Sequence, residues 1–303
     1  MAPARGLARR HDDDDVIVGV EVRDHAIHTI AAEHDGSIVA RDDRPITHGA
    51  FQAALRAVAT GPITAFGIAV RTSVVPALTE FASAAAVDAG CEPRFFTAGA
   101  AVAAAEQWRG AGRRAQHVIA IVADDRVEAG IVIDGRVFHG AHGRAGAAGW
   151  LALNPVERDD YRRLGCLQAE VASAGIVRRL MWRVKAGDAS QAVALAGGNI
   201  DAVTAQHVFD AARTGDPVAR GVVRDTVRYI GMAIANLATV FDPQVIVLSG
   251  QIADASDLLL APVRAEALRH LPPAIATTLE IAASTLGEDA AALGAARAAM
   301  LAS

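Results

Sequence analysis

The sequence predicts an α/β protein in which one folding unit occurs twice. Residues 16–46 and 117–141 each read as a strand, a sharp turn, a second strand, an Asp-Gly turn and a third strand. An Asp-Gly pair between apolar runs is a strong hairpin signal. A later run, PQVIVLSG at 243–250, is continuously apolar and closed by glycine, which is typical of a parallel strand buried on both faces. Because strands and helical stretches interleave, we expect one sheet in each of two lobes.

The other elements follow from periodicity and from turn residues. In the first half we predict helices over 51–59, 76–89 and 98–108 and a strand over 63–70. Residues 140–168 are rich in glycine and charge and contain Pro155, so we expect an irregular, exposed segment. Beyond it we predict helices over 169–185, 190–195, 202–214, 217–241, 258–270 and 289–301, with strands over 244–248 and 278–283.

The domain division follows from these elements. A chain of 303 residues with 52% hydrophobic content can bury the cores of two domains. We expect a disordered tail at 1–15, an N-terminal lobe at 16–115 and a larger C-terminal lobe at 116–286. The last helix, within 287–303, is expected to pack back on the first lobe.

Composition excludes several classes of function. No apolar run reaches the roughly 20 residues of a membrane span, and the N-terminus lacks a signal core, so we expect a cytoplasmic protein without membrane contact. The net charge of −5 argues against direct nucleic-acid binding, which needs a basic face. The two cysteines, Cys91 and Cys166, are too few for a disulfide framework and are predicted to be reduced thiols.

Four strings of this chain resemble one known family. DGRVFHGAHGRAGAAG, LGCLQ, DPQVIVLSGQIADASDLLLAPV and LGEDAAALGAA together are similar to the ROK family of sugar kinases and transcriptional repressors, over nearly the whole chain from Val16. The resemblance implies the duplicated actin-like, ribonuclease H-like ATPase fold, with sugar and ATP bound in a central cleft between two lobes. It also implies dimerisation, with 169–185 and 217–241 as the candidate helices.

The first half departs from the family pattern at its chemical positions. Of the family's Asp-x-Gly-Gly-Thr turn only the acid remains, as Glu21, and Arg71 replaces part of a sugar-site Pro-Gly pair. The family's Asn-Asp pair, whose Asp accepts the proton of the attacking sugar hydroxyl, becomes Thr97 and Ala98. Alanine cannot accept a proton, and general-base assistance is worth about 10² to 10⁴ in rate.

The second half departs in the same way. The Gly-Thr-Gly phosphate turn becomes Asp124-Asp125-Arg126, and carboxylates repel phosphate. Trp150 stands where the family has a histidine that serves both sugar and zinc, and Gln168 replaces a sugar-binding Glu. Of the family's three zinc-binding cysteines only Cys166 remains, whereas a structural zinc site takes four ligands. We therefore expect no cofactor.

Several residues admit two interpretations. His139 and His142 fit loop scaffold better than a metal site, and the carboxylates of 124–128 fit a solvated turn better than a cation site. Trp150 is expected to fill space as core rather than to stack on a ligand. Arg71 either binds an anionic ligand or pairs with Glu21 or Asp24. The candidate cleft-lining residues are Glu21, Arg71, Thr97, Asp124, Asp125, Trp150, Gln168 and Gly250.

Three functions remain open at this stage. We favour a non-catalytic binding or regulatory homologue of the ROK sugar kinases, with a sugar or sugar phosphate as its ligand. An alternative is a divergent, glucokinase-like enzyme that uses ATP and Mg²⁺ and takes Glu21 or another acid as its base. The third is a transcriptional regulator that depends on a partner protein, because fewer than twenty residues precede the first strand and a winged helix-turn-helix does not fit there.

Overall fold

The structure is a computed structural model that describes residues 15–47, 49–70 and 90–302. It divides into two compact units, Met1–Phe96 with Ala291–Ser303 and Thr97–Ala290. The crossover helix, assigned from sequence to the first lobe, makes its contacts in the second unit. The predicted tail over 1–14, Arg71 and the predicted helix over 76–89 lie outside the described residues.

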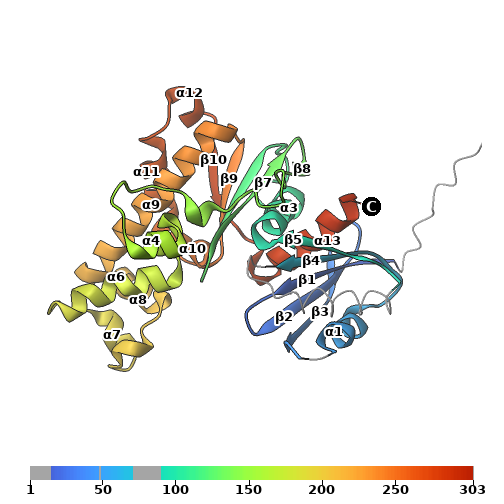
Figure 1. The fold of residues 1–303 in the computed structure, drawn as a ribbon, viewed down its shortest axis with the longest axis horizontal. Helices are drawn as coiled ribbons and strands as arrows, with labels where there is room; N and C mark the ends of the chain where they lie inside the picture. The colour runs from blue at the N-terminus through green and yellow to red at the C-terminus, as the bar shows by residue number, and fades with distance from the viewer. Residues whose placement is uncertain (1–14, 48, 71–89, 303) are drawn as a thin grey trace, which may run out of the picture. The chain divides into compact units, whose positions relative to one another are not determined.

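The first unit is a five-stranded sheet with a helix on each face (Figure 1). Its strand order is β3-β2-β1-β4-β5, and β1 is antiparallel to β2 and parallel to β4. On one face, Val16, Val18 and Val20 pack with Phe51 of α1 in a buried core. The strands are β1 (Val16–Val22), β2 (Ala26–Ala32), β3 (Ile38–Pro45), β4 (Ile63–Val70) and β5 (Pro93–Thr97), and the helices are α1 (Ala50–Val58) and α13 (Ala290–Ala302).

Two glycines let α13 lie directly against the other face of this sheet. A Cβ atom on Gly19 of β1 would overlap the backbone carbonyl of Ala292, and one on Gly67 of β4 would overlap that of Ala295. The two glycines are partners in the parallel register of β1 and β4. The helix therefore packs backbone to backbone, which no larger residue at these positions would allow.

The second unit repeats the strand order of the first. Its sheet runs β10-β9-β6-β7-β8, with β6 antiparallel to β7 and parallel to β9, so the predicted duplication is confirmed. The strands are β6 (Val118–Ala123), β7 (Val127–Ile133), β8 (Arg136–Val137), β9 (Val245–Ser249) and β10 (Glu280–Ala283). The crossover helix α3 (Ala98–Arg109) packs on one face, where the backbones of Gly99 and Gly130 meet.

Helices cover the other face of the second sheet and form the larger core. Ile119 and Ile121 of β6 pack with Ile176, Phe209 and Ile234. The helices of this unit, besides α3, are α4 (Asp159–Leu164), α5 (Cys166–Val171), α6 (Ser173–Lys185), α7 (Gln191–Leu195), α8 (Ala205–Arg213), α9 (Pro217–Phe241), α10 (Gln251–Asp254), α11 (Ser256–Leu268) and α12 (Pro273–Ala276). Short 3₁₀ turns are η1 (Ala148–Trp150), η2 (Ile200–Ala202) and η3 (Gly287–Asp289).

The structure corrects the prediction for 140–185 in two places. Part of the segment expected to be irregular forms α4, whose first turn carries Asp159 and Asp160 and whose last turn carries Arg162 and Arg163. Charges in this order complement the helix dipole, which explains a helix where hydrophobic periodicity is absent. The single helix predicted over 169–185 is broken at Ala172, where the backbone is extended, into α5 and α6.

No described helix is long and apolar enough to cross a bilayer.

Candidate functional site

The turn between β6 and β7 is held by its own aspartate. The Asp124 carboxylate accepts a hydrogen bond at 2.8 Å from the backbone N–H of Gln251, at the start of α10. The backbone carbonyl oxygen of Asp124 accepts two further hydrogen bonds, from the backbone N–H of Ser173 and from Nε2 of Gln251. The turn that carries phosphate in the resembling family is thus fastened here to the first residues of α6 and α10.

Gly250 is what lets Asp124 approach so closely. It has φ +75°, and a Cβ atom at this position would lie 2.5 Å from the Asp124 carboxylate oxygen. A left-handed backbone and a close neighbour together require glycine here. Gly250, one of the predicted site residues, therefore lies beside Asp124.

A second carboxylate, Glu128 on β7, lies at the N-terminus of α3. Its Oε2 atom accepts a hydrogen bond at 3.2 Å from the backbone N–H of Gly99, and the side chain is buried. The neighbouring Thr97 accepts from the N–H of Ala100, as an N-cap residue does. Ala98, which matches the family's base position, lies between Thr97 and Gly99 in the sequence, and its side chain is buried. The structure thus brings an acid to the helix end where the sequence shows an alanine.

Gln168 and Trp150 lie around the same strand. The Gln168 side chain accepts a hydrogen bond at 3.3 Å from the backbone N–H of Val127, at the start of β7. Trp150 belongs to η1 and is 59% exposed. The interpretation of Trp150 as core is therefore wrong: Leu167, Ala148 and Ala169 fill the core there, and the indole faces solvent.

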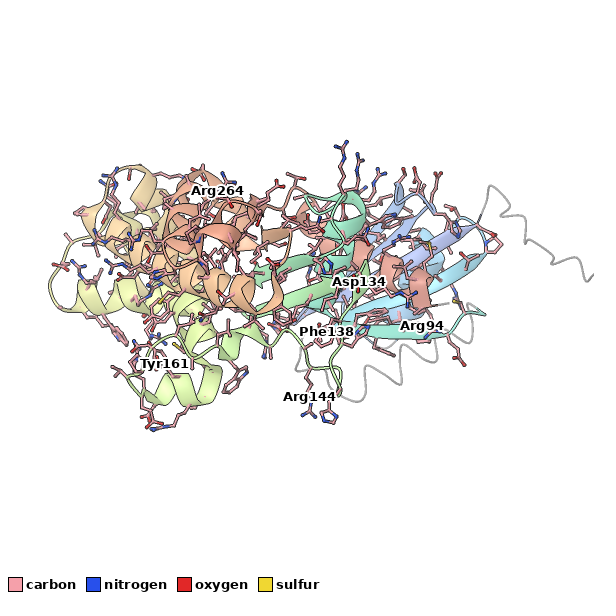
Figure 2. All side chains as sticks on the ribbon, turned by 90° about the horizontal axis from the view of Figure 1, so that it is seen from above. Arg94, Asp134, Phe138, Arg144, Tyr161 and Arg264 are labelled. Atoms are coloured by element: carbon pink, nitrogen blue, oxygen red, sulfur yellow. The ribbon has the colours of Figure 1, made fainter. Side chains whose placement is uncertain are left out.

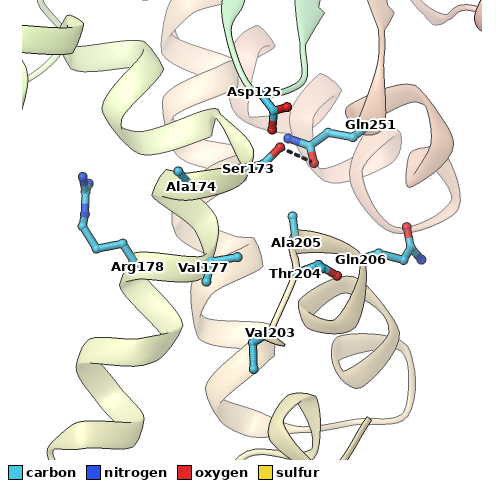
Figure 3. Close-up of a pocket in the computed structure, with 10 residues that line it drawn as sticks. All are labelled: Asp125, Ser173, Ala174, Val177, Arg178, Val203, Thr204, Ala205, Gln206 and Gln251. Atoms are coloured by element: carbon cyan, nitrogen blue, oxygen red, sulfur yellow. Dashed lines mark hydrogen bonds between the residues drawn. The ribbon is translucent and has the colours of Figure 1, made fainter. Parts of the chain in front are cut away.

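A pocket of about 620 Å³ opens next to the Asp124 turn (Figure 3). Ser173 and Gln251, joined by a hydrogen bond of 3.2 Å, lie at one end near Asp125. Val177 and Val203 supply apolar wall, and Figure 3 shows Arg178 extending away from the other lining side chains. The complete lining is Asp125, Ser173, Ala174, Val177, Arg178, Val203, Thr204, Ala205, Gln206 and Gln251. A pocket of this size and mixed lining suits a small molecule with an apolar body and a polar edge.

The surroundings of the Asp124 turn are acidic. Burial, followed by the negative charges of Asp124 and Glu288, raises the pKa of Asp254 on α10 above its usual value. Burial is the larger cause, and the smaller part of the pKa shift comes from these two neighbouring negative charges. An additional anion such as a phosphate would be repelled by the same two carboxylates.

Two predicted site residues do not belong to the described part of the second unit. Glu21 belongs to the first unit, where its buried carboxylate pairs with Nε of Arg23 at 3.0 Å. Arg71 lies outside the described residues, so its two interpretations stay predictions. The residues that the structure does gather within the second unit are Asp124, Asp125, Gly250 and Gln251.

The segment that matches the family's zinc string offers different chemistry. Asp160 pairs with Arg158 at 2.7 Å and with Arg178 at 2.9 Å, and Asp159 pairs with Arg162. Cys166 is buried at the start of α5. Within 15–47, 49–70 and 90–302, no three His, Cys, Asp or Glu side chains gather as metal ligands. Carboxylates bound to guanidinium groups and a single thiol do not fit a tetrahedral zinc site.

The interpretation of 124–128 as a solvated turn is wrong for Glu128, which is buried against the start of α3, and sequence reasoning missed the position of Gln251. Glu128 is the one charged residue in the strand VEAGIVI, and charged residues are rarely fully buried unless they have a partner. That isolated charge was the available signal for a buried contact. No pattern in the sequence around Gln251 predicts its contact with Asp124, which is 127 residues away.

Comparison with known proteins identifies the family. The family model described as "ROK family" matches residues 57–301. The chain belongs to the ROK family. Its fold, an α/β structure of two lobes, is the actin-like ATPase fold of the ROK kinases.

Relatives of this ROK protein include enzymes and a regulator. It is 35% identical over 191 residues to a glucokinase of Halalkalibacterium halodurans, covering 62% of this chain and 58% of the enzyme. It is 30% identical over 191 residues to the DNA-binding transcriptional dual regulator NagC of Escherichia coli, covering 63% of this chain and 46% of NagC. The matched part thus spans less than two thirds of either relative's length.

Solved ROK structures share the fold. The glucokinase of Streptomyces griseus, in complex with glucose and AMPPNP, superposes with a TM-score of 0.78 at 24% identity, covering 94% of this chain and 99% of the enzyme. A ROK family transcriptional regulator, a homologue of the E. coli MLC protein, superposes with a TM-score of 0.79 at 22% identity, covering 95% and 78% of the two chains. Kinases and regulators therefore share this scaffold.

Proposed function

We propose that this ROK protein is a non-catalytic homologue of the sugar kinases that binds a small ligand and acts in regulation. One observation supports it most. Two backbone N–H groups at helix starts, those of Gln251 and Gly99, are occupied by the chain's own carboxylates, Asp124 and Glu128. Such N–H groups commonly bind phosphate, so at the Asp124 turn an internal carboxylate takes the place of the nucleotide's anion.

The proposal includes the ligand and the assembly. A sugar or sugar phosphate is the ligand class, because named relatives are glucokinases and a structural neighbour holds glucose. The expected cytoplasmic location, the absence of zinc and of nucleotide cofactors, and a homodimer are parts of the same proposal. The base position at Ala98 supports the loss of phosphoryl transfer, because a methyl group accepts no proton.

The first test measures thermal unfolding of the purified protein with Mg-ATP, ADP, neutral hexoses, N-acetylated sugars and sugar phosphates. A ligand at 100 times its Kd adds about 2.7 kcal/mol to the free energy of unfolding. We expect a raised midpoint with a sugar or sugar phosphate, none with nucleotide, and no phosphoryl transfer in a coupled assay. Stabilisation by both Mg-ATP and a neutral sugar, together with turnover, would falsify the proposal.

A variant sharpens this test. Asp124→Gly returns a glycine to the turn and frees the N–H of Gln251, so Mg-ADP should now stabilise the protein. The matched control is Asp24→Gly in the corresponding turn of the first unit, where the side chain is exposed. The control should not gain nucleotide binding. If Asp124→Gly does not gain it either, Asp124 is not the residue that prevents nucleotide binding.

One observation favours the divergent kinase as a second candidate. Glu128 brings a carboxylate to the first turn of α3, beside the alanine at the family's base position. If the protein does transfer phosphate to a sugar, Glu128→Gln should lower kcat about 10²- to 10⁴-fold, the usual worth of a general base. Glu157→Gln, at an exposed carboxylate, is the control that should leave kcat unchanged. Equal kcat values for both variants would exclude Glu128 as the base.

A further inference from the structure

A second cavity, separate from the pocket beside Asp124, lies between α6, α9 and the loop that precedes α4. Its volume is about 630 Å³, within the range of small-molecule sites. We call it the arginine groove, after its lining arginines Arg158, Arg179, Arg183 and Arg228. The only lining carboxylates, among the described residues, are Glu170, Asp188 and Asp225. The lining therefore carries one net positive charge.

The carboxylate at the floor of the groove is fully engaged. Glu170, which is 2% exposed, accepts hydrogen bonds from Nη1 of Arg158 at 2.9 Å and from the hydroxyl of Tyr161 at 2.8 Å. Nε of Arg179 lies 3.4 Å away and forms a further ion pair. Tyr161, labelled in Figure 2, also contacts the hydroxyl of Tyr229, and burial raises its pKa well above the usual value. Glu170 is thus shared among several donors, and Asp160 is shared by Arg158 and Arg178. With Asp160 and Arg178 included, the arginines around the groove still outnumber the carboxylates by one.

Arg179 shows the resulting imbalance. Its Nη atoms donate to the backbone carbonyls of Val222 and Glu170 and to the hydroxyl of Thr226, whereas its buried Nε has no hydrogen-bond acceptor. Burial lowers the pKa of this guanidinium, although Glu170 and Asp225 oppose the shift. Glu170 and Asp225 therefore offset only part of the cost of burying this charge, and a further negative charge nearby would offset more of it.

The wall of the groove is aromatic and apolar. Trp182 is 53% exposed, and two guanidinium groups, of Arg158 and Arg178, lie 5.2 and 5.1 Å from its ring centroid. Cation–π contacts hold the indole in place while part of it remains accessible. Leu153, Val222 and Met232 add aliphatic surface to the same lining. An ordered aromatic side chain offers contact area with little loss of entropy on binding.

We propose that the arginine groove binds a small organic monoanion, a carboxylate with an aromatic or aliphatic body. The carboxylate lies among the arginines, and the body packs on Trp182 and the aliphatic lining. One unit of negative charge completes the balance of the groove. A ligand without charge leaves the excess cation uncompensated, and a multiply charged one reverses the sign.

Isothermal titration calorimetry with 3-phenylpropionate and with its neutral amide tests the charge and the body separately. We expect the carboxylate to bind at least tenfold more tightly than the amide. Trp182→Ala and Arg228→Ala should each weaken binding about tenfold, which corresponds to about 1.4 kcal/mol. Arg162→Ala is the matched control, because this side chain is as exposed as Arg228 but does not line the groove. Equal affinities for acid and amide, or no binding of either, overturn the proposal.

Asp225→Asn keeps the test decisive if another variant fails to fold. It replaces a half-exposed carboxylate by its isostere and raises the net charge of the lining by one, so the carboxylate should bind about fivefold more tightly. Unchanged or weaker binding contradicts the proposal. Sedimentation velocity of the wild type and of Trp182→Ala examines the other possible occupant. If Trp182→Ala turns a dimer into a monomer, a second copy of the chain covers the groove and the proposal is wrong.

Discussion

The two units have the same strand order but close the turn after their first strand in different ways. In the first unit, the N–H of Arg23 donates to Ala26 and its guanidinium pairs with Glu21, so these contacts stay within one hairpin. In the second, Asp124 bonds to Gln251, which is 127 residues away, and to Ser173. The two units thus share the strand order of their sheets, whereas the contacts of each turn depend on the elements that lie beside it.

The largest expected effects test whether both sheets depend on the same packing device. Gly67→Ala places a Cβ atom on the carbonyl of Ala295, and Gly130→Ala places one on that of Gly99. Because the obstacle is backbone in both cases, we expect each change to cost about 3 kcal/mol or more, at the upper end of overpacking effects. Denaturant unfolding measures the cost.

Gly221→Ala in α9 is the control for these two changes. Only the ends of long arginine side chains lie near that position, so the change should be neutral or stabilising by up to about 1 kcal/mol. If either sheet variant matches this control, the backbone-to-backbone packing in that unit is not a constraint.

A smaller effect separates the two turns. Asp124→Ala leaves the N–H of Gln251 without its carboxylate acceptor, so we expect a loss of about 1 to 3 kcal/mol in the free energy of unfolding. Asp24→Ala, at the corresponding exposed position, should stay within about 0.5 kcal/mol of the wild type. Urea unfolding of both variants checks the contrast. Equal losses would mean that the two turns are fastened to the same extent.

The third prediction uses pH to identify acid-sensitive packing in the second unit. Burial alone would raise the pKa of Asp216, but hydrogen bonds from the N–H groups of Ala219, Gln191 and Val218 lower it overall. A lowered pKa contributes stability above the unfolded value of about 3.9, and this stability is lost as pH falls through the folded value.

Asp216→Asn should therefore flatten the fall in stability below about pH 4 while keeping an acceptable N-cap residue. Unfolding free energies measured between pH 3 and 7 give the slope. An unchanged slope would show that Asp216 does not contribute to acid unfolding.

The smallest effects come from one ion-paired, partly exposed arginine in each unit. Arg44 pairs with Asp42 on β3, and Arg213 pairs with Asp257 and Asp210 across α8 and α11. Arg44→Ala and Arg213→Ala should each cost about 1 kcal/mol or less, because the arginine side chains, 26% and 30% exposed, still meet water that weakens their ion pairs. The cost should shrink in 1 M NaCl, where screening is strong. A cost that does not depend on salt would indicate lost packing of the arginine stem instead.

Most strands could be predicted because local patterns specify them. The runs VIVGVEV and VIAIVA are apolar, and Asp-Gly turns bound the hairpins, so these elements were visible in sequence. β5, with the sequence PRFFT, was missed because a strand of five residues beginning with proline carries no such pattern. The helix α4 was missed because its stability comes from charge placement and ion pairs rather than from periodicity.

The candidate site was predictable only in part. Residue types at matching positions indicated which groups differ from the family, including Ala98 and Asp124. They could not indicate that Glu128 would reach Gly99 or that Asp124 would reach Gln251, because both contacts depend on how distant elements meet. The exposure of Trp150 was mispredicted for the same reason, since neighbouring side chains decide which residue fills a core.

Residues of helix α6 line both cavities, and Arg178 of this helix has contacts near each of them. It lines the pocket beside Asp124, while its guanidinium reaches Asp160 and the Trp182 ring next to the arginine groove. If a ligand in the pocket displaces Arg178, it removes a contact of the Trp182 ring and so alters the free energy of binding in the groove. Thermodynamic linkage makes the exchange symmetrical, so each ligand alters the affinity of the other by the same factor. Arg178 would then couple the two cavities without any contact between their ligands.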